Sequence, residues 1–281
     1  MKIIDINEKE YPRVLRKIEN PPKKLYVEGA ERILNSNCIA VVGSRKNTKY
    51  GEKWCKKFVK ELVKYDLKIV SGMAIGIDLI AHKEAIKEGG KTIAVLPSGL
   101  KNIYPKENIK LYEEIISNGG CVISEYEPYE EAESKKFLER NRIVSGISIG
   151  CLVVEAAYRS GTSVTARLTK NQKRDVFCIP GSLDNSKSIG TNKLIKDFAK
   201  LVTSPEDIIK NYEFLHKIEL EKPEEKEENE ILKLIKEDPI NIDDIVKLSN
   251  KNIKEIISEI TILELDGKIE RLPGNMYIRG E

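Results

Sequence analysis

The chain has 281 residues, 40% of them hydrophobic and 33% charged, which is typical of a globular protein with one large core and room for a small second domain. No apolar run of about 18 residues occurs, which excludes a membrane-spanning helix. Residues 1–10 lack the apolar stretch of a signal peptide, so we expect a cytoplasmic protein. Residues 1–212 carry 37 Lys and Arg against 27 Asp and Glu, a balance of +10 that suggests a polyanionic partner.

Short apolar runs alternate with amphipathic stretches as far as residue 180. The expected strands are residues 24–27, 38–42, 67–70, 92–96, 121–123, 151–154 and 176–179. The expected helices are residues 50–65, 76–88, 107–117, 135–145 and 163–171. This alternation predicts an α/β fold with a parallel sheet covered on both faces. Six core strands are too few for a TIM barrel, so we expect an extended Rossmann-like open sheet.

The remaining sequence predicts the domain organisation. Residues 1–36 are expected to be an N-terminal extension packed on the core, and residues 37–212 the Rossmann-like domain. Residues 213–229 are rich in Glu and predict an acidic linker. Residues 230–281 predict three helices and a hairpin with a Pro-Gly-Asn turn, a pattern typical of a small winged-helix domain.

The cysteines indicate neither a disulfide framework nor a metal site. Their number is odd and none has CxxC spacing, so we interpret them as buried thiols: Cys38, Cys55, Cys121, Cys151 and Cys178. With His82 and His216 as the only histidines, a zinc site is not expected, and no other metal or cofactor is predicted.

Small and polar residues follow several of the expected strands. Gly43, Ser44 and Arg45 come after residues 38–42, Tyr50 and Gly51 open the next helix, and Gly72 follows residues 67–70. Open α/β sheets bind ligands at the carboxyl ends of their strands. Glycines allow a close backbone approach, helix N-terminal amides attract anions, and Arg has a fork suited to phosphate. Each glycine alone could simply form a tight turn, but the set predicts a site for a phosphate-bearing ligand.

The sequence does not favour a nucleotide-dependent enzyme. Neither the dinucleotide fingerprint GxGxxG after the first core strand nor the P-loop GxxxxGK[ST] occurs. Asp78, Glu125 and Glu155 are candidate bases, and His82 lies four residues after Asp78, but this spacing is more typical of a structural helix pair. We therefore expect no catalytic residues. A nucleotide-binding or nucleotide-cleaving Rossmann-type enzyme remains an alternative, as does a scaffold that binds only proteins.

Residues 135–142 combine cations with one aromatic side chain. Four cations, Lys135, Lys136, Arg140 and Arg142, surround Phe137. Such a mixture suits single-stranded nucleic acid, because cations follow the phosphates and an aromatic ring stacks on a base. The alternative is a solvated helix face with Phe137 in the core.

The ordered motifs of residues 11–205 resemble those of the DprA (Smf) family of DNA-processing proteins. They are Tyr11-Pro12, Pro21-Pro22, Gly43-Ser44-Arg45, Tyr50-Gly51, Ser71-Gly72-Met73-Ala74-Ile75-Gly76-Ile77-Asp78, Ala81-His82, Tyr104-Pro105, Ser124-Glu125, Phe137, Arg140-Asn141-Arg142, Glu155, Ser160-Gly161-Thr162, Pro180-Gly181 and Gly190-Thr191-Asn192. The resemblance implies a homodimer that binds single-stranded DNA without sequence preference. It further implies that the protein loads RecA onto incoming DNA in natural transformation, and that it is not a catalyst.

The resemblance also indicates a binding site. Its implied DNA-binding residues are Gly43, Ser44, Arg45, Phe137, Arg140, Asn141, Arg142, Ser160, Gly161 and Thr162, with Lys136 a looser match. From the strand ends we add Tyr50, Gly51 and Gly72. Two features depart from the family pattern. Too few residues precede the first motif for the helical domain that many relatives carry, and Phe198-Ala199 stands where relatives commonly have Gly-Ala, near the family's self-association and RecA-contact region.

The C-terminal domain is expected to contact a protein rather than duplex DNA. Lys251 and Lys254 lie near the start of its third helix, but Glu255, Glu259 and Glu264 share that helix. An acidic surface opposes docking on phosphates.

Overall fold

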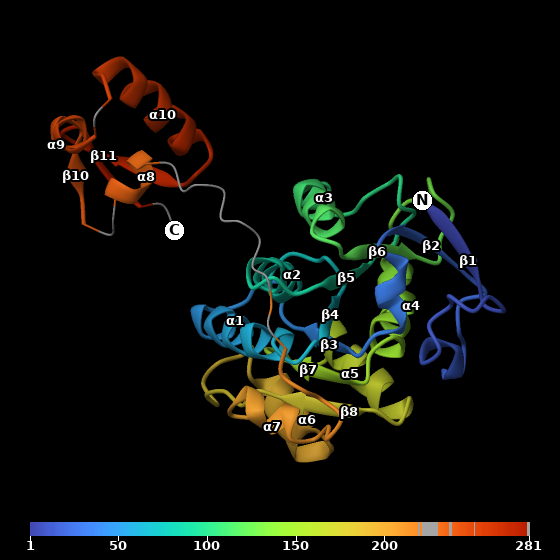
Figure 1. The fold of residues 1–281 in the computed structure, drawn as a ribbon. Coiled ribbons are helices and arrows are strands. Elements are labelled where there is room, and N and C mark those ends of the chain that lie inside the picture. Colours follow the sequence, from blue (N-terminus) through green and yellow to red (C-terminus); the bar gives the residue numbers. More distant parts are fainter. Residues whose placement is uncertain (219, 221–229, 236–237, 250, 280–281) are drawn as a thin grey trace. The chain divides into compact units, whose positions relative to one another are not determined.

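The computed structural model describes residues 1–218, 220, 230–235, 238–249 and 251–279 (Figure 1). The chain divides into two compact units, Met1–Pro223 and Glu224–Glu281. Most of the expected acidic linker, residues 219 and 221–229, lies outside the described residues. Each unit is described by itself below.

The first unit is built on a nine-stranded, mostly parallel sheet in the order β1-β2-β6-β5-β4-β3-β7-β8-β9. The strands are β1 Lys2–Asp5, β2 Lys24–Gly29, β3 Cys38–Val42, β4 Lys68–Ser71, β5 Thr92–Val95, β6 Cys121–Ser124, β7 Gly150–Val153, β8 Asp175–Cys178 and β9 Lys200–Leu201. β1 pairs antiparallel with β2, and β2 antiparallel with β6. The pairs from β6 to β9 are parallel. The predicted Rossmann-like α/β class is confirmed.

The strand order reverses beside β3. From β3 the chain builds β4, β5 and β6 on one side, and then returns to place β7, β8 and β9 on the other. β3 and β7 are therefore neighbours, with Val42 opposite Val153 at their carboxyl ends. The loops that follow these two strands leave toward opposite sides, which opens a crevice at this edge of the sheet.

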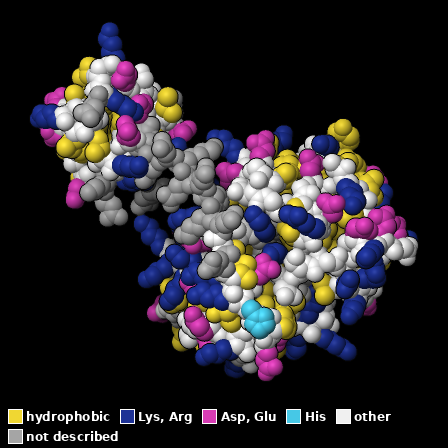
Figure 2. Space-filling view, in the orientation of Figure 1, with side chains coloured by type: hydrophobic (Ala, Val, Ile, Leu, Met, Phe, Trp, Pro, Cys, Tyr) yellow, Lys and Arg dark blue, Asp and Glu magenta, His cyan; other side chains and the backbone are white. Residues whose placement is uncertain are grey.

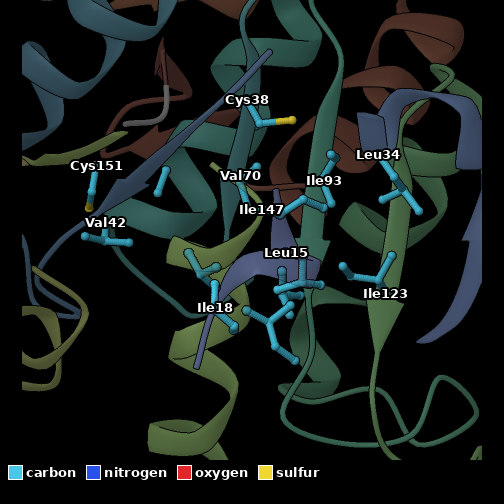
Figure 3. Packing of buried hydrophobic residues seen from close by; sticks show 14 of the residues in the cluster. Leu15, Ile18, Leu34, Cys38, Val42, Val70, Ile93, Ile123, Ile147 and Cys151 are labelled. Atoms are coloured by element: carbon cyan, nitrogen blue, oxygen red, sulfur yellow. The ribbon is translucent and has the colours of Figure 1, made fainter. Parts of the chain in front are cut away.

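Helices cover both faces of the sheet (Figure 1). They are α1 Lys49–Val63, α2 Ile77–Lys87, α3 Ile109–Ser117, α4 Ser134–Gly146, α5 Gly161–Asn171, α6 Ile189–Asp197 and α7 Pro205–Ile209, with 3-10 turns at Leu15–Lys17, Glu31–Asn35 and Lys106–Asn108. Alternate residues of each strand point to opposite faces. Ile39 and Val41 of β3 pack with α1 and α2, whereas Cys38 and Val42 pack on the side of α4, α5 and α6. Figure 3 shows this second cluster, where Leu15 from the N-terminal segment joins the core.

The cysteines are free and buried, as expected: Cys38, Cys55, Cys121, Cys151 and Cys178. Burial disfavours the thiolate and raises the pKa of Cys38 and of Cys151 to about 12. These thiols are apolar packing elements of the sheet and of α1.

The second unit is the predicted winged helix. Its elements are α8 Glu230–Leu234, β10 Ile240–Asn241, α9 Ile242–Leu248, α10 Ile253–Leu265, β11 Ile269–Leu272 and β12 Met276–Arg279, with the sheet order β10-β12-β11. Ile231, Ile245, Ile256 and Ile260 form its small core with Tyr277 of the hairpin. Across both units, no described helix is long and apolar enough to cross a membrane.

Candidate nucleic-acid interface

A cleft of about 480 Å³ lies at the carboxyl ends of β3 and β7, where the strand order reverses. Its lining residues come from the end of β3, from the loops after β3, β4, β7 and β8, and from α2, α4 and α5: Val42, Gly43, Ser44, Arg45, Lys46, Gly72, Ala74, Asp78, Phe137, Leu138, Arg140, Asn141, Val144, Ala157, Ser160, Gly161, Thr162, Thr165 and Lys187. Three segments that the sequence singled out separately therefore line the same cleft: the loop after β3, α4 and the residues 160–162 at the start of α5.

The loop after β3 is held close to the sheet. A Cβ on Gly43 would lie 2.5 Å from Cγ1 of Ile77, so only glycine lets the backbone pass here. The amide of Ile77 donates to the Ser44 carbonyl over 3.2 Å, and Thr162 Oγ1 donates to the Gly43 carbonyl over 3.0 Å. The first turns of α2 and α5 thus fix the loop that carries Arg45.

Glu155 anchors the other end of this loop. Its side chain is buried and accepts hydrogen bonds from the backbone amide of Thr48 over 2.9 Å and from Thr48 Oγ1 over 2.5 Å. Thr48 is the N-cap of α1 and accepts from the amide of Gly51. A Cβ on Gly51 would overlap the Glu155 carboxylate. Gly51 and Glu155 therefore serve the loop's structure, which leaves this carboxylate poorly placed to act as a base on a ligand.

Arg45 and Phe137 form the exposed wall of the cleft. The Arg45 guanidinium lies 5.0 Å from the centroid of the Phe137 ring, and the Tyr104 ring packs edge-on against Phe137 at 5.5 Å. Arg45 is exposed, and among the described residues it forms no ion pair with a carboxylate. The arrangement presents a cation and an aromatic ring together, a combination suited to a phosphate and a base.

Arg140 forms the buried floor of the cleft. It is 4% exposed and donates from Nη1 to the carbonyl of Gly72 over 2.7 Å and to the carbonyl of Val95. Burial lowers its pKa to about 10, opposed by the nearby carboxylate of Asp78. Asp78 accepts from the amide of Gly72 over 3.1 Å, and burial raises its pKa. Arg140 therefore acts mainly as a bracket between β4 and β5.

The start of α5 also lines the cleft. Ser160 is the N-cap and accepts from the amide of Ser163 over 3.3 Å. Gly161 is exposed, and a Cβ there would meet no atom within 4 Å. The unpaired amides of a helix N-terminus favour an anion, and Lys46 and Lys187 add positive charge to the cleft.

Of the predicted site residues, ten line the cleft, and Tyr50, Gly51, Lys136 and Arg142 do not. The Tyr50 hydroxyl donates to the carbonyl of Pro180 over 2.7 Å. Lys136 forms ion pairs of 3.1 Å with Glu130 and Glu133. Arg142 forms a 2.6 Å ion pair with Glu125.

Sequence reasoning did not single out Lys46 and Lys187 as site residues. Lys46 could have been found, since it directly follows Arg45. Lys187 gave no such signal, because it enters the cleft from the loop between β8 and α6, far along the chain.

The histidine on α2 plays no part in the cleft. His82 is fully buried, and its Nδ1 lies 2.6 Å from Thr92 Oγ1, which itself donates to the carbonyl of Ile69. Burial lowers the His82 pKa to about 3, so the ring is neutral. The described residues contain no cluster of three or more His, Cys, Asp or Glu side chains that could hold a metal ion.

Positive charge is widespread on the surface of the first unit. Figure 2 shows many Lys and Arg side chains on the face in view, with Asp and Glu scattered among them. The α1 helix alone exposes Lys49, Lys53, Lys56, Lys57 and Lys60. The cleft therefore lies on a unit whose general field attracts polyanions.

The fold and the cleft define a Rossmann-like protein with a cationic, aromatic-lined site at the switch point of its sheet. The chain belongs to the DNA recombination-mediator protein A family, whose model matches residues 2–213, and the model of the DprA winged helix domain matches residues 219–275. The resemblance to DprA and Smf proteins is thereby confirmed.

Curated relatives and solved structures agree with this assignment. The chain is 37% identical to Protein Smf of Escherichia coli, over 99% of this chain and 77% of that protein. It is 43% identical to DNA processing protein DprA of Streptococcus pneumoniae, over 73% of this chain and 72% of that protein. The structure of the pneumococcal protein superposes with a TM-score of 0.72, at 41% identity over 76% of this chain and 75% of that one. A structure of DNA processing protein A from Helicobacter pylori, described for its single-stranded DNA binding mode, has a TM-score of 0.67 at 31% identity, over 75% of this chain and 95% of that one.

Proposed function

We propose that the cleft binds single-stranded DNA without sequence preference. The observation that carries this proposal is the contact of Arg45 with Phe137 in a cleft that the N-terminus of α5 also lines. A guanidinium and helix amides suit phosphates of any sequence, and an aromatic ring stacks on any base. The single-stranded DNA binding mode described for the Helicobacter pylori relative supports the same ligand class.

A nucleotide-cleaving enzyme is less well supported. Glu155, the strongest candidate base, is 1% exposed, and both of its carboxylate oxygens accept hydrogen bonds from Thr48. Glu125 is paired with Arg142, away from the cleft. Asp78 lines the cleft but is buried beside Arg140 and bonded to the amide of Gly72. The carboxylates near the site thus have structural partners, which favours binding over catalysis.

The cellular role that we propose follows from the family. The match to a recombination-mediator family supports a protein that protects incoming single-stranded DNA and loads RecA onto it in natural transformation. We further propose that it acts as a cytoplasmic homodimer. Capture of purified RecA by the immobilised protein, with and without oligo-dT, tests the partner, and light scattering across a concentration series tests the dimer.

For the winged-helix unit we propose a protein partner. Its α10 helix exposes Ile253, Ile257 and Ile262, each about half accessible. Lys251, two residues before this helix, forms a 2.7 Å ion pair with Glu259, so its charge is partly neutralised. Exposed isoleucines beside paired charges suit a protein surface better than a phosphate backbone. Weak binding of duplex DNA by this unit is the expected consequence.

The central test is a titration of labelled oligo-dT, followed by fluorescence anisotropy at two salt concentrations. We expect salt-sensitive binding that Arg45→Ala weakens at least tenfold, because a phosphate contact and a stacking partner of Phe137 are both lost. Lys173→Ala is the matched control, since Lys173 is an exposed cation beyond the C-terminal end of α5, far along the helix from the cleft. Salt-independent binding, or equal losses in the two variants, would contradict the proposal.

A further inference from the structure

A second concave site lies beside the cleft. This Tyr50 hollow, also of about 480 Å³, is lined by Tyr50, Pro180, Gly181, Ser182 and Asn185. Its lining combines one aromatic ring with backbone and small polar groups. None of these residues lines the cleft, so the hollow is a separate site on the same unit.

The walls of the Tyr50 hollow are held in place by specific bonds. The Tyr50 hydroxyl donates to the carbonyl of Pro180 over 2.7 Å, while the residue as a whole remains 40% exposed. Asn192 on α6 bonds both backbone groups of Gly181, accepting from its amide over 3.2 Å and donating to its carbonyl over 2.9 Å. The ring is thus fixed by its hydroxyl end with part of its surface open, the state expected of a pre-formed stacking platform.

The cleft and the hollow are lined by residues that are near each other in the chain. The loop after β3 carries Lys46, which lines the cleft, and leads into α1, whose second residue Tyr50 lines the hollow. In the loop after β8, Lys187 lines the cleft and Asn185 lines the hollow, and the amide of Lys187 donates to Asn185 Oδ1 over 2.9 Å. A chain of n residues spans at most about 3.6 Å × n, so Lys187 and Asn185 are within about 7 Å of each other. Two lysines that line the cleft are therefore within four residues along the chain of residues that line the hollow.

We propose that the Tyr50 hollow receives a base of the same DNA strand that the cleft binds, on the far side of Lys46 and Lys187. The inference rests on the proposed function and adds the path that the strand takes beyond the cleft. The strand leaves the cleft between the two lysines, which contact its phosphates, and a base then packs on the Tyr50 ring. Because any base offers a flat aromatic face, this second site preserves sequence independence.

A strand explains the hollow better than a separate ligand does. Its polar groups are few, and Asn185 Oδ1 and Ser182 Oγ already accept from the nearby backbone amides of Lys187 and Asp184. A free nucleotide would need a phosphate partner inside the hollow, and none of the five lining residues is charged. The cations lie on the side of the cleft, as they should if the phosphates run between the two sites.

The proposal is tested with an oligo-dT length series, from about 4 to about 16 nucleotides, the range of site sizes for single-stranded DNA grooves. We compare the wild type with Tyr50→Ala, Tyr50→Phe and Arg45→Ala. Binding is read by anisotropy and by the emission of Trp54, the only tryptophan of the chain, whose ring lies 6.1 Å from that of Tyr50. A base entering the hollow should change this emission.

We expect Tyr50→Ala to weaken the longer oligonucleotides about tenfold and to leave the shortest unchanged, since the shortest fills the cleft alone. The Trp54 response to long oligonucleotides should disappear in Tyr50→Ala and persist in Tyr50→Phe, which keeps the ring. Equal losses at all lengths, or a Phe variant as weak as the Ala variant, would show that Tyr50 only supports the loop of the cleft and would overturn the proposal. If Arg45→Ala weakens every length while Tyr50→Ala changes none, the hollow fails and the proposed function stands. If neither variant affects binding, both fail.

Discussion

The guanidinium of Arg140 occupies the space that a side chain on residue 72 would need. A Cβ on Gly72 would overlap both terminal nitrogens of Arg140, and one of them, Nη1, donates to the Gly72 and Val95 carbonyls. Glycine at this position therefore allows an arginine from α4 to tie together the ends of β4 and β5 under the cleft.

We expect Gly72→Ala to lower the free energy of unfolding by more than about 3 kcal/mol. The methyl group displaces the buried guanidinium, and each buried polar group that loses its partner costs about 1–3 kcal/mol. Urea denaturation measures the change. Gly161→Ala is the control, because a Cβ there meets no atom within 4 Å. Equal stability of the two variants would show that Arg140 can relax without loss.

The contributions of Phe137 and Arg45 to DNA affinity should differ in their dependence on salt concentration. Phe137→Ala removes a stacking surface, which is worth about 1–3 kcal/mol per base, or roughly 5- to 150-fold in affinity. For Phe137→Ala, a plot of the logarithm of the DNA-binding constant against the logarithm of salt concentration should keep the wild-type slope. Arg45→Ala should reduce that slope by about 0.7, the value for one phosphate contact on a single strand. Anisotropy titrations at several salt concentrations give both numbers, and a changed slope in the Phe137 variant would contradict the separate roles.

Glu155→Gln should destabilise the fold by about 1.5–3 kcal/mol, because the charged acceptor of two Thr48 hydrogen bonds is lost. Glu52→Gln, on the exposed surface of α1 in an i,i+4 pair with Lys56, should cost less than about 1 kcal/mol. Thermal unfolding compares the two variants. Incubation of the wild type with nucleotides should release no product; release that Glu155→Gln abolishes would instead support catalysis by this residue.

His82 should make stability depend on pH. Its folded pKa is about 3, against 6.5 for an unperturbed histidine, so between these values the unfolded chain binds a proton that the folded chain does not. Above pH 6.5 His82 is neutral in both states and does not lower the free energy of unfolding. As the pH falls from 6.5 toward 3, the free energy of unfolding decreases by up to about 1.4 kcal/mol per pH unit. His82→Gln should make the curve shallower by this amount. Burial raises the pKa of Asp78 and Glu84, but both remain in the variant, so the difference between the two curves isolates His82. Parallel curves would contradict the assignment.

Local patterns were enough to predict the core of the sheet. The β3 strand was predicted with its observed bounds, because a buried parallel strand is a continuous apolar run. The β1 strand was missed because it is an antiparallel edge strand of four residues with one buried side chain. The α6 helix was also missed, since Gly190 and Thr191 near its start are poor helix formers that are stabilised by packing.

The site was predictable where the residues themselves carry the chemistry. Arg45, Phe137 and Gly161 meet at one cleft because loops at the carboxyl edge of a parallel sheet converge. Lys136 and Arg142 were harder to place, because each cation is held by an ion pair with a carboxylate instead of facing the cleft. The partner of Arg142 is Glu125, 17 residues away in the chain.

The buried cysteines can report the order in which parts of the protein unfold. All five thiols lie in the first unit and are inaccessible in the native state, and burial holds their pKa values above the ordinary range. A thiol reagent can therefore modify them only when a segment of that unit opens. Because β3, β6, β7, β8 and α1 each contain one thiol, the order of alkylation records the order in which these elements separate, without any engineered label. The winged-helix unit contains no cysteine and contributes no signal, so the alkylation record reports on the first unit alone.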